Sequence, residues 1–171
     1  MTARIHSIWL LPTASDEVLL TGIVKELSGR FGTPIFAPHL TVLGDSEMTA
    51  DALAHAIETA AQEVSAFAEA VNAVETSEAY FRSFYARFPV ATPLIRLKQA
   101  LDPQGLEGFM PHVSLLYGPV EAAAKAQAAR EIGERLTGRS IRFDRLCVVT
   151  SGQEVAIADW RVVVTAPLGE G

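Results

Sequence analysis

The sequence predicts an α+β protein made of two similar halves. Candidate strands and helices are mixed along the chain without the strict strand–helix–strand alternation of a doubly wound sheet. A block of nine residues, 36–44, returns in the same register as residues 109–118, each copy containing Phe, Pro, His and a hydroxyl residue. No linker rich in Gly, Ser or Pro separates the halves. We therefore expect one domain over residues 1–171, with two lobes packed together.

The first half is expected to form strand, helix, strand and helix. A strand over residues 4–11 should end at Pro12, and residues 13–16 offer N-cap candidates for the helix that follows. Apolar residues then recur at helical spacing, and Gly29 supplies a stop. The first repeated block should be a strand. A second helix, capped by Thr49, should follow it.

The second half adds more strands. Its elements begin with two strands in sequence, and Pro93 suits the first turn of the next helix. The second repeated block is again a predicted strand. The predicted strands are residues 67–76, 80–88, 141–150 and 160–166, with a short one over 155–157, and the predicted helices are residues 92–102 and 121–136.

Composition excludes several classes of function. The 171-residue chain carries a formal charge of −6 and has no run of Lys or Arg, so a long nucleic acid is not an expected partner. Cys147 is the single cysteine, so neither an internal disulfide nor a cysteine-based zinc site can form. Apolar runs fall far short of the roughly 20 residues of a membrane-spanning helix. Without a signal-peptide pattern, we expect a cytoplasmic protein, and a monomer.

The two repeated blocks carry the residues of a candidate site. Side chains alternate faces along a strand, so His39 and Thr41 should lie on one face, and His112 and Ser114 on one face of the other strand. Each strand then presents an imidazole beside a hydroxyl on one face and aliphatic residues to a core on the other. Two of the four histidines of the chain therefore occupy equivalent positions.

Two such strands facing each other would suit the cleavage of a phosphodiester without a metal or other cofactor. Near neutral pH one imidazole can accept a proton from water while the other gives one to the leaving alkoxide. Hydroxyl groups can donate to phosphate oxygens. Zinc binding by His39 and His112 lacks a third ligand at motif spacing.

The paired blocks resemble those of the two-histidine phosphoesterase superfamily. The strings at residues 7–12, 38–42 and 111–117 are most similar to its cyclic phosphodiesterase branch. The resemblance implies a bilobal α+β fold, with two antiparallel sheets related by a pseudo-two-fold axis around a central cleft and helices outside. It also implies metal-independent hydrolysis of a small cyclic phosphodiester, a nucleoside 2′,3′-cyclic phosphate or ADP-ribose 1″,2″-cyclic phosphate, to a phosphomonoester.

The resemblance also assigns site residues. His39 and His112 would be the acid–base pair, in an order that the sequence leaves open, and Thr41 and Ser114 would bind phosphate oxygens. Trp9 and Tyr117 would be aromatic residues near the cleft, available to stack on a base. Strand alternation, however, puts Tyr117 on the face opposite Ser114 unless the strand bends.

Other interpretations stay open at this point. Each histidine alone could be structural, and the pair could belong to a nucleotide- or RNA-end-binding module without turnover. The wider superfamily also includes RNA ligase-like and 2′,5′-phosphodiesterase proteins, for which a basic surface is expected. Neither block contains a basic residue to balance a phosphate charge. The candidates on neighbouring elements are Arg82, Arg87, Arg96 and Lys98.

Overall fold

The computed structural model describes residues 4–170 and has eight strands and four α-helices in that range. The strands are β1 (Ile5–Pro12), β2 (Leu40–Ser46), β3 (Phe67–Ala70), β4 (Ala73–Thr76), β5 (Phe84–Arg87), β6 (His112–Leu116), β7 (Ser140–Ser151) and β8 (Arg161–Pro167). The helices are α1 (Ala14–Phe31), α2 (Ala50–Glu63), α3 (Thr92–Leu101) and α4 (Ala122–Leu136), with short 3₁₀ turns η1 (Tyr80–Arg82), η2 (Pro103–Gly105) and η3 (Ile157–Asp159).

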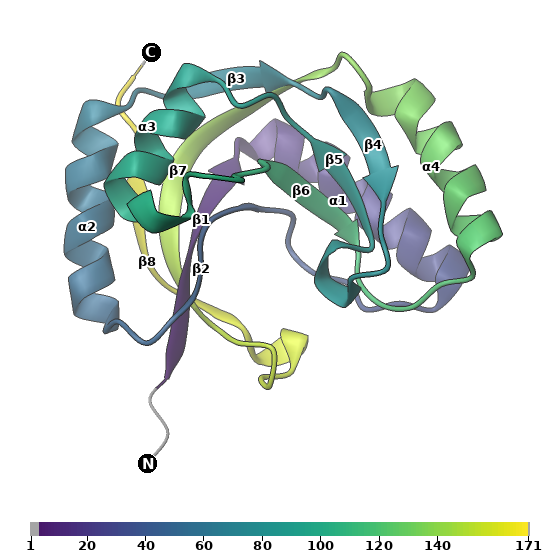
Figure 1. Ribbon diagram of the computed structural model, residues 1–171, viewed down its shortest axis with the longest axis horizontal. Helices are drawn as coiled ribbons and strands as arrows, with labels where there is room; N and C mark the ends of the chain where they lie inside the picture. The colour runs from purple at the N-terminus through teal and green to yellow at the C-terminus, as the bar shows by residue number, and fades with distance from the viewer. Residues whose placement is uncertain (1–3, 171) are drawn as a thin grey trace.

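The strands form an antiparallel sheet in the order β3-β7-β1-β2-β6-β5-β4, with β8 added to β7. The helices lie around the outside of this sheet (Figure 1). The predicted α+β class is therefore confirmed. The expectation of two separate sheets is not, because β2 and β6 join the halves through the pair Leu40–Val113.

The two halves repeat one order of elements, and their helices are exchanged. The first half contains β1-α1-β2-α2 and the second β5-α3-β6-α4. Helix α1 of the first half packs on β6, whereas α3 of the second half packs on β2. Each repeated block is therefore covered by the helix that precedes the other block, which ties the halves together.

Strand alternation separates the core from the opposite face of the sheet. On β1, Ile8 and Leu10 are fully buried in the main core, with the apolar stripe of α1. Trp9, between them, belongs to a second, smaller cluster with Cys147 and Val149 of β7. Because alternate residues of one strand point to opposite faces, this second cluster lies on the face away from the core helices.

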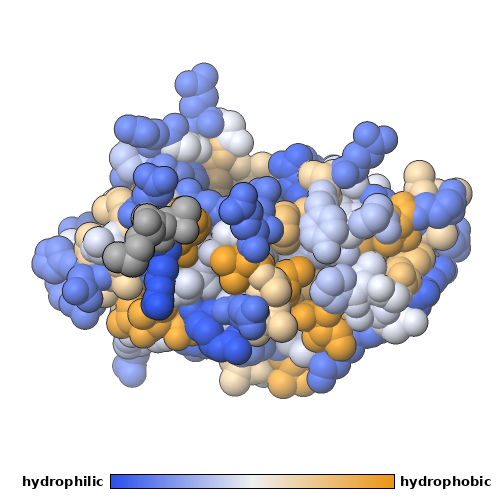
Figure 2. Space-filling model, turned by 90° about the horizontal axis from the view of Figure 1, so that it is seen from below, coloured by the Kyte–Doolittle hydropathy of each residue, from blue (hydrophilic) through white to orange (hydrophobic). Residues whose placement is uncertain are grey.

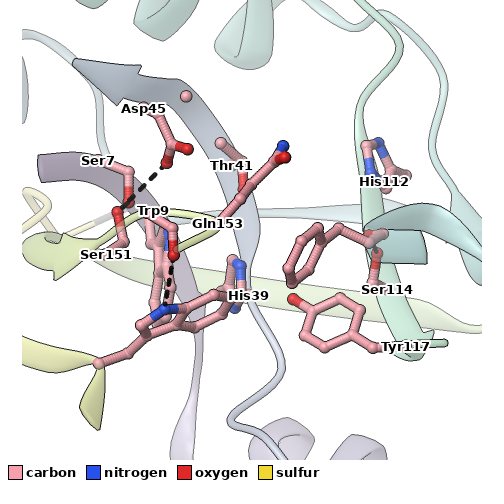
Figure 3. A pocket seen from close by; sticks show the side chains of 14 residues that line it. Ser7, Trp9, His39, Thr41, Asp45, His112, Ser114, Tyr117, Ser151 and Gln153 are labelled. Carbon is pink, nitrogen blue, oxygen red and sulfur yellow. Dashed lines mark hydrogen bonds between the residues drawn. The ribbon is translucent and has the colours of Figure 1, made fainter. Parts of the chain in front are cut away.

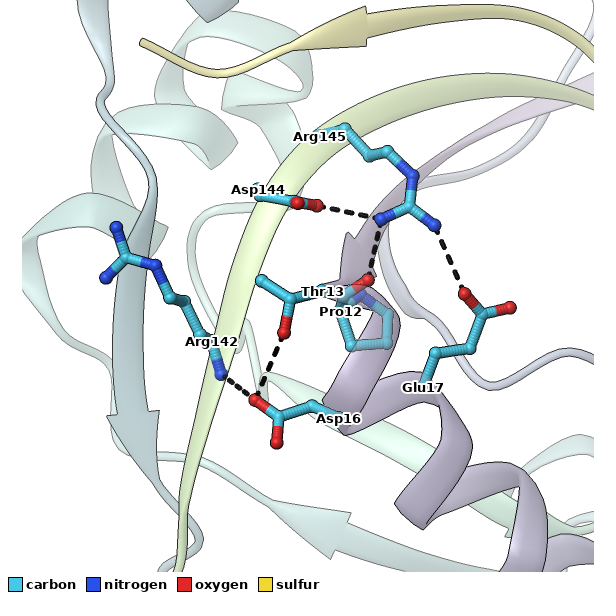
Figure 4. Close-up of polar contacts among 7 residues, drawn as sticks. All are labelled: Pro12, Thr13, Asp16, Glu17, Arg142, Asp144 and Arg145. Atoms are coloured by element: carbon cyan, nitrogen blue, oxygen red, sulfur yellow. Dashed lines mark hydrogen bonds and ion pairs between the residues drawn. The ribbon is translucent and has the colours of Figure 1, made fainter. Parts of the chain in front are cut away.

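The start of α1 is fixed to β7 by polar contacts (Figure 4). Thr13, one of the N-cap candidates predicted over residues 13–16, is the N-cap residue of α1. Its hydroxyl donates to the carboxylate of Asp16 at 3.4 Å and makes no bond to a backbone amide of the helix. Asp16 also accepts the backbone N–H of Arg142 at 2.8 Å, and Arg145 donates to the carbonyl of Pro12 at 2.7 Å. These bonds hold the end of β1 and the first turn of α1 against one strand.

Two predicted boundaries in the first half of the chain are wrong. Helix α1 continues past Gly29 to Phe31 and ends at Gly32, whose φ of +69° is the left-handed conformation that favours glycine. One glycine inside a helix costs only about 1 kcal/mol, less than the packing of the apolar stripe supplies. The predicted strand over residues 67–76 is two strands. Between the two strands, the backbone N–H of Val71 donates to the carbonyl of Arg139, and that of Asn72 donates to the carbonyl of Arg87. The first strand, β3, therefore pairs with β7, and the second, β4, pairs with β5.

Two further predictions of strand are also corrected. The predicted strand over residues 80–88 begins with the turn η1, and its extended part is β5. The predicted short strand over residues 155–157 is a turn leading into η3, closed by the bond from the amide of Val155 to the carbonyl of Gly152.

The surface seen from below mixes hydrophobic and hydrophilic side chains (Figure 2). Of the helices in residues 4–170, none has the length and apolar content that crossing a membrane requires.

Candidate active site

A cavity of about 280 Å³ opens on the sheet face away from the core helices. All six residues predicted for the site line it: Trp9, His39, Thr41, His112, Ser114 and Tyr117. They come from β1, from β2 and the residue before it, and from β6 and the residue after it. Figure 3 shows His39 and Thr41 on one side of the pocket and His112 and Ser114 on the other.

The two histidines are held in the same way. Nδ1 of His39 lies 2.8 Å from the carbonyl oxygen of Ala37, and Nδ1 of His112 lies 2.9 Å from that of Met110. A carbonyl oxygen can only accept, so each Nδ1 carries the proton and donates it. Nε2 of each ring is then the nitrogen free to exchange a proton with a ligand. The repeated block thus sets one tautomer twice, because in both copies the acceptor is the carbonyl two residues before the histidine.

Burial lowers the pKa of both imidazoles, and the pKa of His39 is lowered more than that of His112. Desolvation lowers the pKa of His39 from 6.5 to about 4. The hydrogen bond to Ala37 opposes this shift, and electrostatic repulsion from His112 adds to it. The pKa of His112 is also lowered, first by desolvation and then by the positive charge of Arg82, against the bond to Met110. Of the two, His39 is the ring that more strongly favours its neutral form.

The hydroxyl groups differ between the two copies. Thr41 is half-buried at the cavity wall. Ser114 is buried, and its Oγ donates to the carbonyl of Phe81 at 2.9 Å. A hydroxyl has one proton and rotates freely, so Ser114 must turn away from Phe81 before it can donate to a ligand.

Trp9 packs against a histidine. Its ring is stacked on His39, with ring centroids 3.5 Å apart and planes 6° from parallel. One face of Trp9 is therefore occupied by the imidazole, and the Trp9 and Trp160 rings meet in a T-shaped contact. This packing fixes the plane of the His39 ring.

Tyr117 lines the same cavity as Ser114, although strand alternation alone puts it on the other face. The reason is that β6 ends at Leu116, and the chain turns through Gly118, whose φ is +113°. The Tyr117 ring stacks on Phe36 at 3.7 Å, and its hydroxyl points into the pocket (Figure 3). Burial raises the pKa of Tyr117, so its hydroxyl stays protonated and can donate.

Eight further residues line the cavity that were not among the predicted site residues. They are Ser7, Gly44, Asp45, Phe81, Ser151, Gly152, Gln153 and Trp160. Ser7 lies two residues before Trp9, and Asp45 four after Thr41, so strand alternation could have indicated both. The residues from β7 and the following loop are brought in by pairing between distant strands, for which the sequence carries no local signal.

The four basic residues considered from the sequence lie outside the cavity wall. Arg82 is the one whose charge reaches the site: its guanidinium lies over Tyr85, whose ring packs edge-on against His112. Arg87 pairs with Glu75, and buried Lys98 bonds the carbonyl of Val42 and the carboxylate of Asp102. Arg96 is exposed on α3. Within residues 4–170 no cluster of three or more His, Cys, Asp or Glu side chains is placed to hold a metal ion.

Comparison with known proteins agrees with this geometry. The model of the 2′-5′ RNA ligase superfamily matches residues 27–154, which include both histidine blocks. The chain belongs to this superfamily. The predicted resemblance to two-histidine phosphoesterases is therefore confirmed.

Individual relatives cover nearly the whole chain. A cyclic phosphodiesterase of Arabidopsis thaliana is 26% identical over 172 residues, covering 96% of this chain and 95% of its own. Among solved structures, E. coli LigT complexed with 3′-AMP has a TM-score of 0.62 at 16% identity, covering 99% of this chain and all of its own. TT0787 of Thermus thermophilus has a TM-score of 0.63 at 16% identity, covering 98% and 100%. The superfamily and the plant relative together support the predicted enzyme class, a phosphodiesterase.

Proposed function

We propose that this protein hydrolyses a small cyclic phosphodiester to a phosphomonoester without a metal ion. The observation that carries the proposal is the equivalent placement of His39 and His112 at one cavity, each with Nδ1 bonded to a backbone carbonyl and Nε2 free. Two such imidazoles provide both proton transfers of the hydrolysis. The plant relative is named as a cyclic phosphodiesterase, and E. coli LigT has been solved with 3′-AMP and with phosphate, which supports a small phosphate ligand here.

We assign the base to His39 and the acid to His112. Nε2 of neutral His39 takes a proton from water, whose oxygen attacks phosphorus. The P–O bond to one ribose oxygen breaks, and Nε2–H of His112 protonates that oxygen. His39 suits the base because its pKa is lowered to about 4, which keeps it neutral. At His112, the negative charge of the bound diester favours the protonated form.

The remaining lining groups would hold the phosphate and nucleoside. Thr41 and the Tyr117 hydroxyl can donate to non-bridging oxygens, and Ser114 can do so after leaving Phe81. Trp9 and Tyr117 also line the cavity, but His39 covers one face of the Trp9 ring and Phe36 one face of the Tyr117 ring, so at most the other face of each can stack on a base.

The proposal is tested by turnover in the presence of EDTA. Purified protein is incubated with nucleoside 2′,3′-cyclic phosphates and with ADP-ribose 1″,2″-cyclic phosphate, and the product is followed by phosphorus NMR. Appearance of a monoester that is lost in His39→Ala and His112→Ala supports the proposal. Binding of a cyclic phosphate that stays intact for hours would instead indicate a binding module. Affinity that grows with oligonucleotide length and falls steeply with salt would indicate an RNA-directed enzyme.

A further inference from the structure

The charge of the cavity wall is unbalanced. Among the described residues that line it, Asp45 is the one carboxylate, and none is Lys or Arg. The positive charge of Arg82, whose guanidinium lies over Tyr85, acts on His112. In Figure 3, Asp45 lies on one side of the pocket and His112 on the opposite side. Positive charge therefore acts on the His112 side of the pocket, and the one negative charge of the described wall, Asp45, lies on the opposite side.

Asp45 is the end of a chain of hydroxyl groups. Ser7 Oγ and Ser151 Oγ lie 2.8 Å apart, and Ser151 Oγ lies 3.5 Å from Oδ1 of Asp45. A carboxylate can only accept, so Ser151 donates to Asp45 and its own oxygen accepts from Ser7. The two serines are buried, whereas Asp45 is exposed at the mouth. Both serine protons are therefore used within the chain, and the carboxylate keeps lone pairs for a ligand.

The Asp45 carboxylate, at the end of this chain of hydroxyl groups, accepts hydrogen bonds and repels anions. A ribose hydroxyl or a base amine can donate to the carboxylate. A phosphate at the same place would meet a like charge, with neither Lys nor Arg in the described wall to compensate. The cavity volume of about 280 Å³ lies just below the range of roughly 300–1,000 Å³ that is usual for ligand sites, which also favours a small nucleoside.

We propose that Asp45 is a specificity-determining residue that selects cyclic phosphodiesters with an uncharged nucleoside portion. Resting on the proposed function, this inference names nucleoside 2′,3′-cyclic phosphates as the preferred substrate class. Substrates with further phosphates, such as ADP-ribose 1″,2″-cyclic phosphate, are disfavoured. The cyclic diester lies at the histidines, and the uncharged end of the nucleoside faces Asp45.

The test compares two substrates that differ in one group. kcat/KM is measured for adenosine 2′,3′-cyclic phosphate and for the same compound with a 5′-phosphate, with ADP-ribose 1″,2″-cyclic phosphate as a third substrate. The wild type should prefer the unphosphorylated compound. Asp45→Asn should reduce that preference roughly tenfold, mainly through a lower KM for the phosphorylated substrates. Rising ionic strength should weaken the preference of the wild type and leave that of Asp45→Asn little changed.

Glu47→Gln is the matched control. Glu47 is exposed just after β2 and does not line the cavity, so this variant removes the same charge outside the site and should keep the wild-type preference. An equal preference in wild type and Asp45→Asn, or an equal loss in Glu47→Gln, overturns the role of Asp45 while turnover of the cyclic phosphates still upholds the proposed function. Absence of turnover of every cyclic phosphate by the wild type overturns the proposed function, and this inference with it.

Discussion

Leu40 of β2 and Val113 of β6 are paired where the two halves of the sheet meet, and each directly follows one of the two histidines. Both residues are fully buried in the core. In an antiparallel pair, this register puts His39 opposite Ser114, and Thr41 opposite His112, on the other face. This one strand pair therefore contributes Leu40 and Val113 to the core on one face and brings two imidazoles and two hydroxyls together on the other.

Removal of either imidazole should abolish most of the activity. His39→Ala and His112→Ala should each reduce kcat/KM for a nucleoside 2′,3′-cyclic phosphate by about 10²–10⁴, because one proton transfer loses its carrier. The measurement is initial-rate kinetics in EDTA. His55→Ala is the matched control, since His55 is exposed on α2. A cyclic phosphodiesterase activity that survives in both site variants would return the pair to a structural role.

The residues of the site could be predicted from the sequence more fully than the fold around them. The two blocks predict His39, Thr41, His112 and Ser114 together because strand alternation is local and the repeat supplies the partner. The break at Val71 and Asn72 could not be predicted, since these residues bond to Arg139 and Arg87, which are distant in the sequence. The contact of Asp45 with Ser151, and of Ser151 with Ser7, depends on the pairing of β1 with β7, which joins residues far apart in the sequence.

Gly29 and Tyr117 show the limits of local rules. A glycine is a helix stop only where the apolar stripe also ends, and in α1 the helix goes on to Gly32. Alternation holds only inside a strand, and β6 ends one residue before Tyr117. Both corrections depend on where an element ends, which tertiary packing decides.

The pH dependence of the reaction should be bell-shaped with a mildly acidic maximum. kcat/KM reports the free enzyme, in which the base His39 must be neutral and the acid His112 protonated. Activity should rise as pH increases through about 4, the pKa of His39. It should fall through the pKa of His112, which lies below its ordinary value of 6.5. The maximum is therefore expected between these two values.

Arg82 gives this assignment a separate test. Its positive charge lowers the pKa of His112, so Arg82→Gln should move the alkaline limb to higher pH and leave the acidic limb in place. Arg96→Gln, an exposed residue on α3, is the control. If only the acidic limb moved in Arg82→Gln, His112 would be the base and His39 the acid.

The hydroxyl of Tyr117 should contribute to binding or to the transition state. Tyr117→Phe keeps the ring that stacks on Phe36 and removes only the donor that points into the cavity. The loss of one such bond is worth about 1 kcal/mol, so kcat/KM should fall roughly five- to tenfold. Tyr80→Phe removes the hydroxyl of an exposed tyrosine and serves as the control. Unchanged kinetics in Tyr117→Phe would limit Tyr117 to packing.

The burial of His39 should make the fold less stable in acid. The unfolded chain binds a proton at this residue near pH 6.5, whereas the folded chain binds it only near pH 4, so stability is complete above 6.5 and falls as pH decreases toward 4. At about 1.4 kcal/mol per pH unit, the loss reaches about 3 kcal/mol. Urea unfolding at pH 7 and pH 4 measures it. His39→Gln keeps a neutral polar side chain, so it should show a loss smaller by about that amount, and His55→Gln a loss like that of the wild type. An equal loss in wild type and His39→Gln would mean that His39 is protonated in the folded protein at much higher pH, and the assignment of His39 as the base would then fail as well.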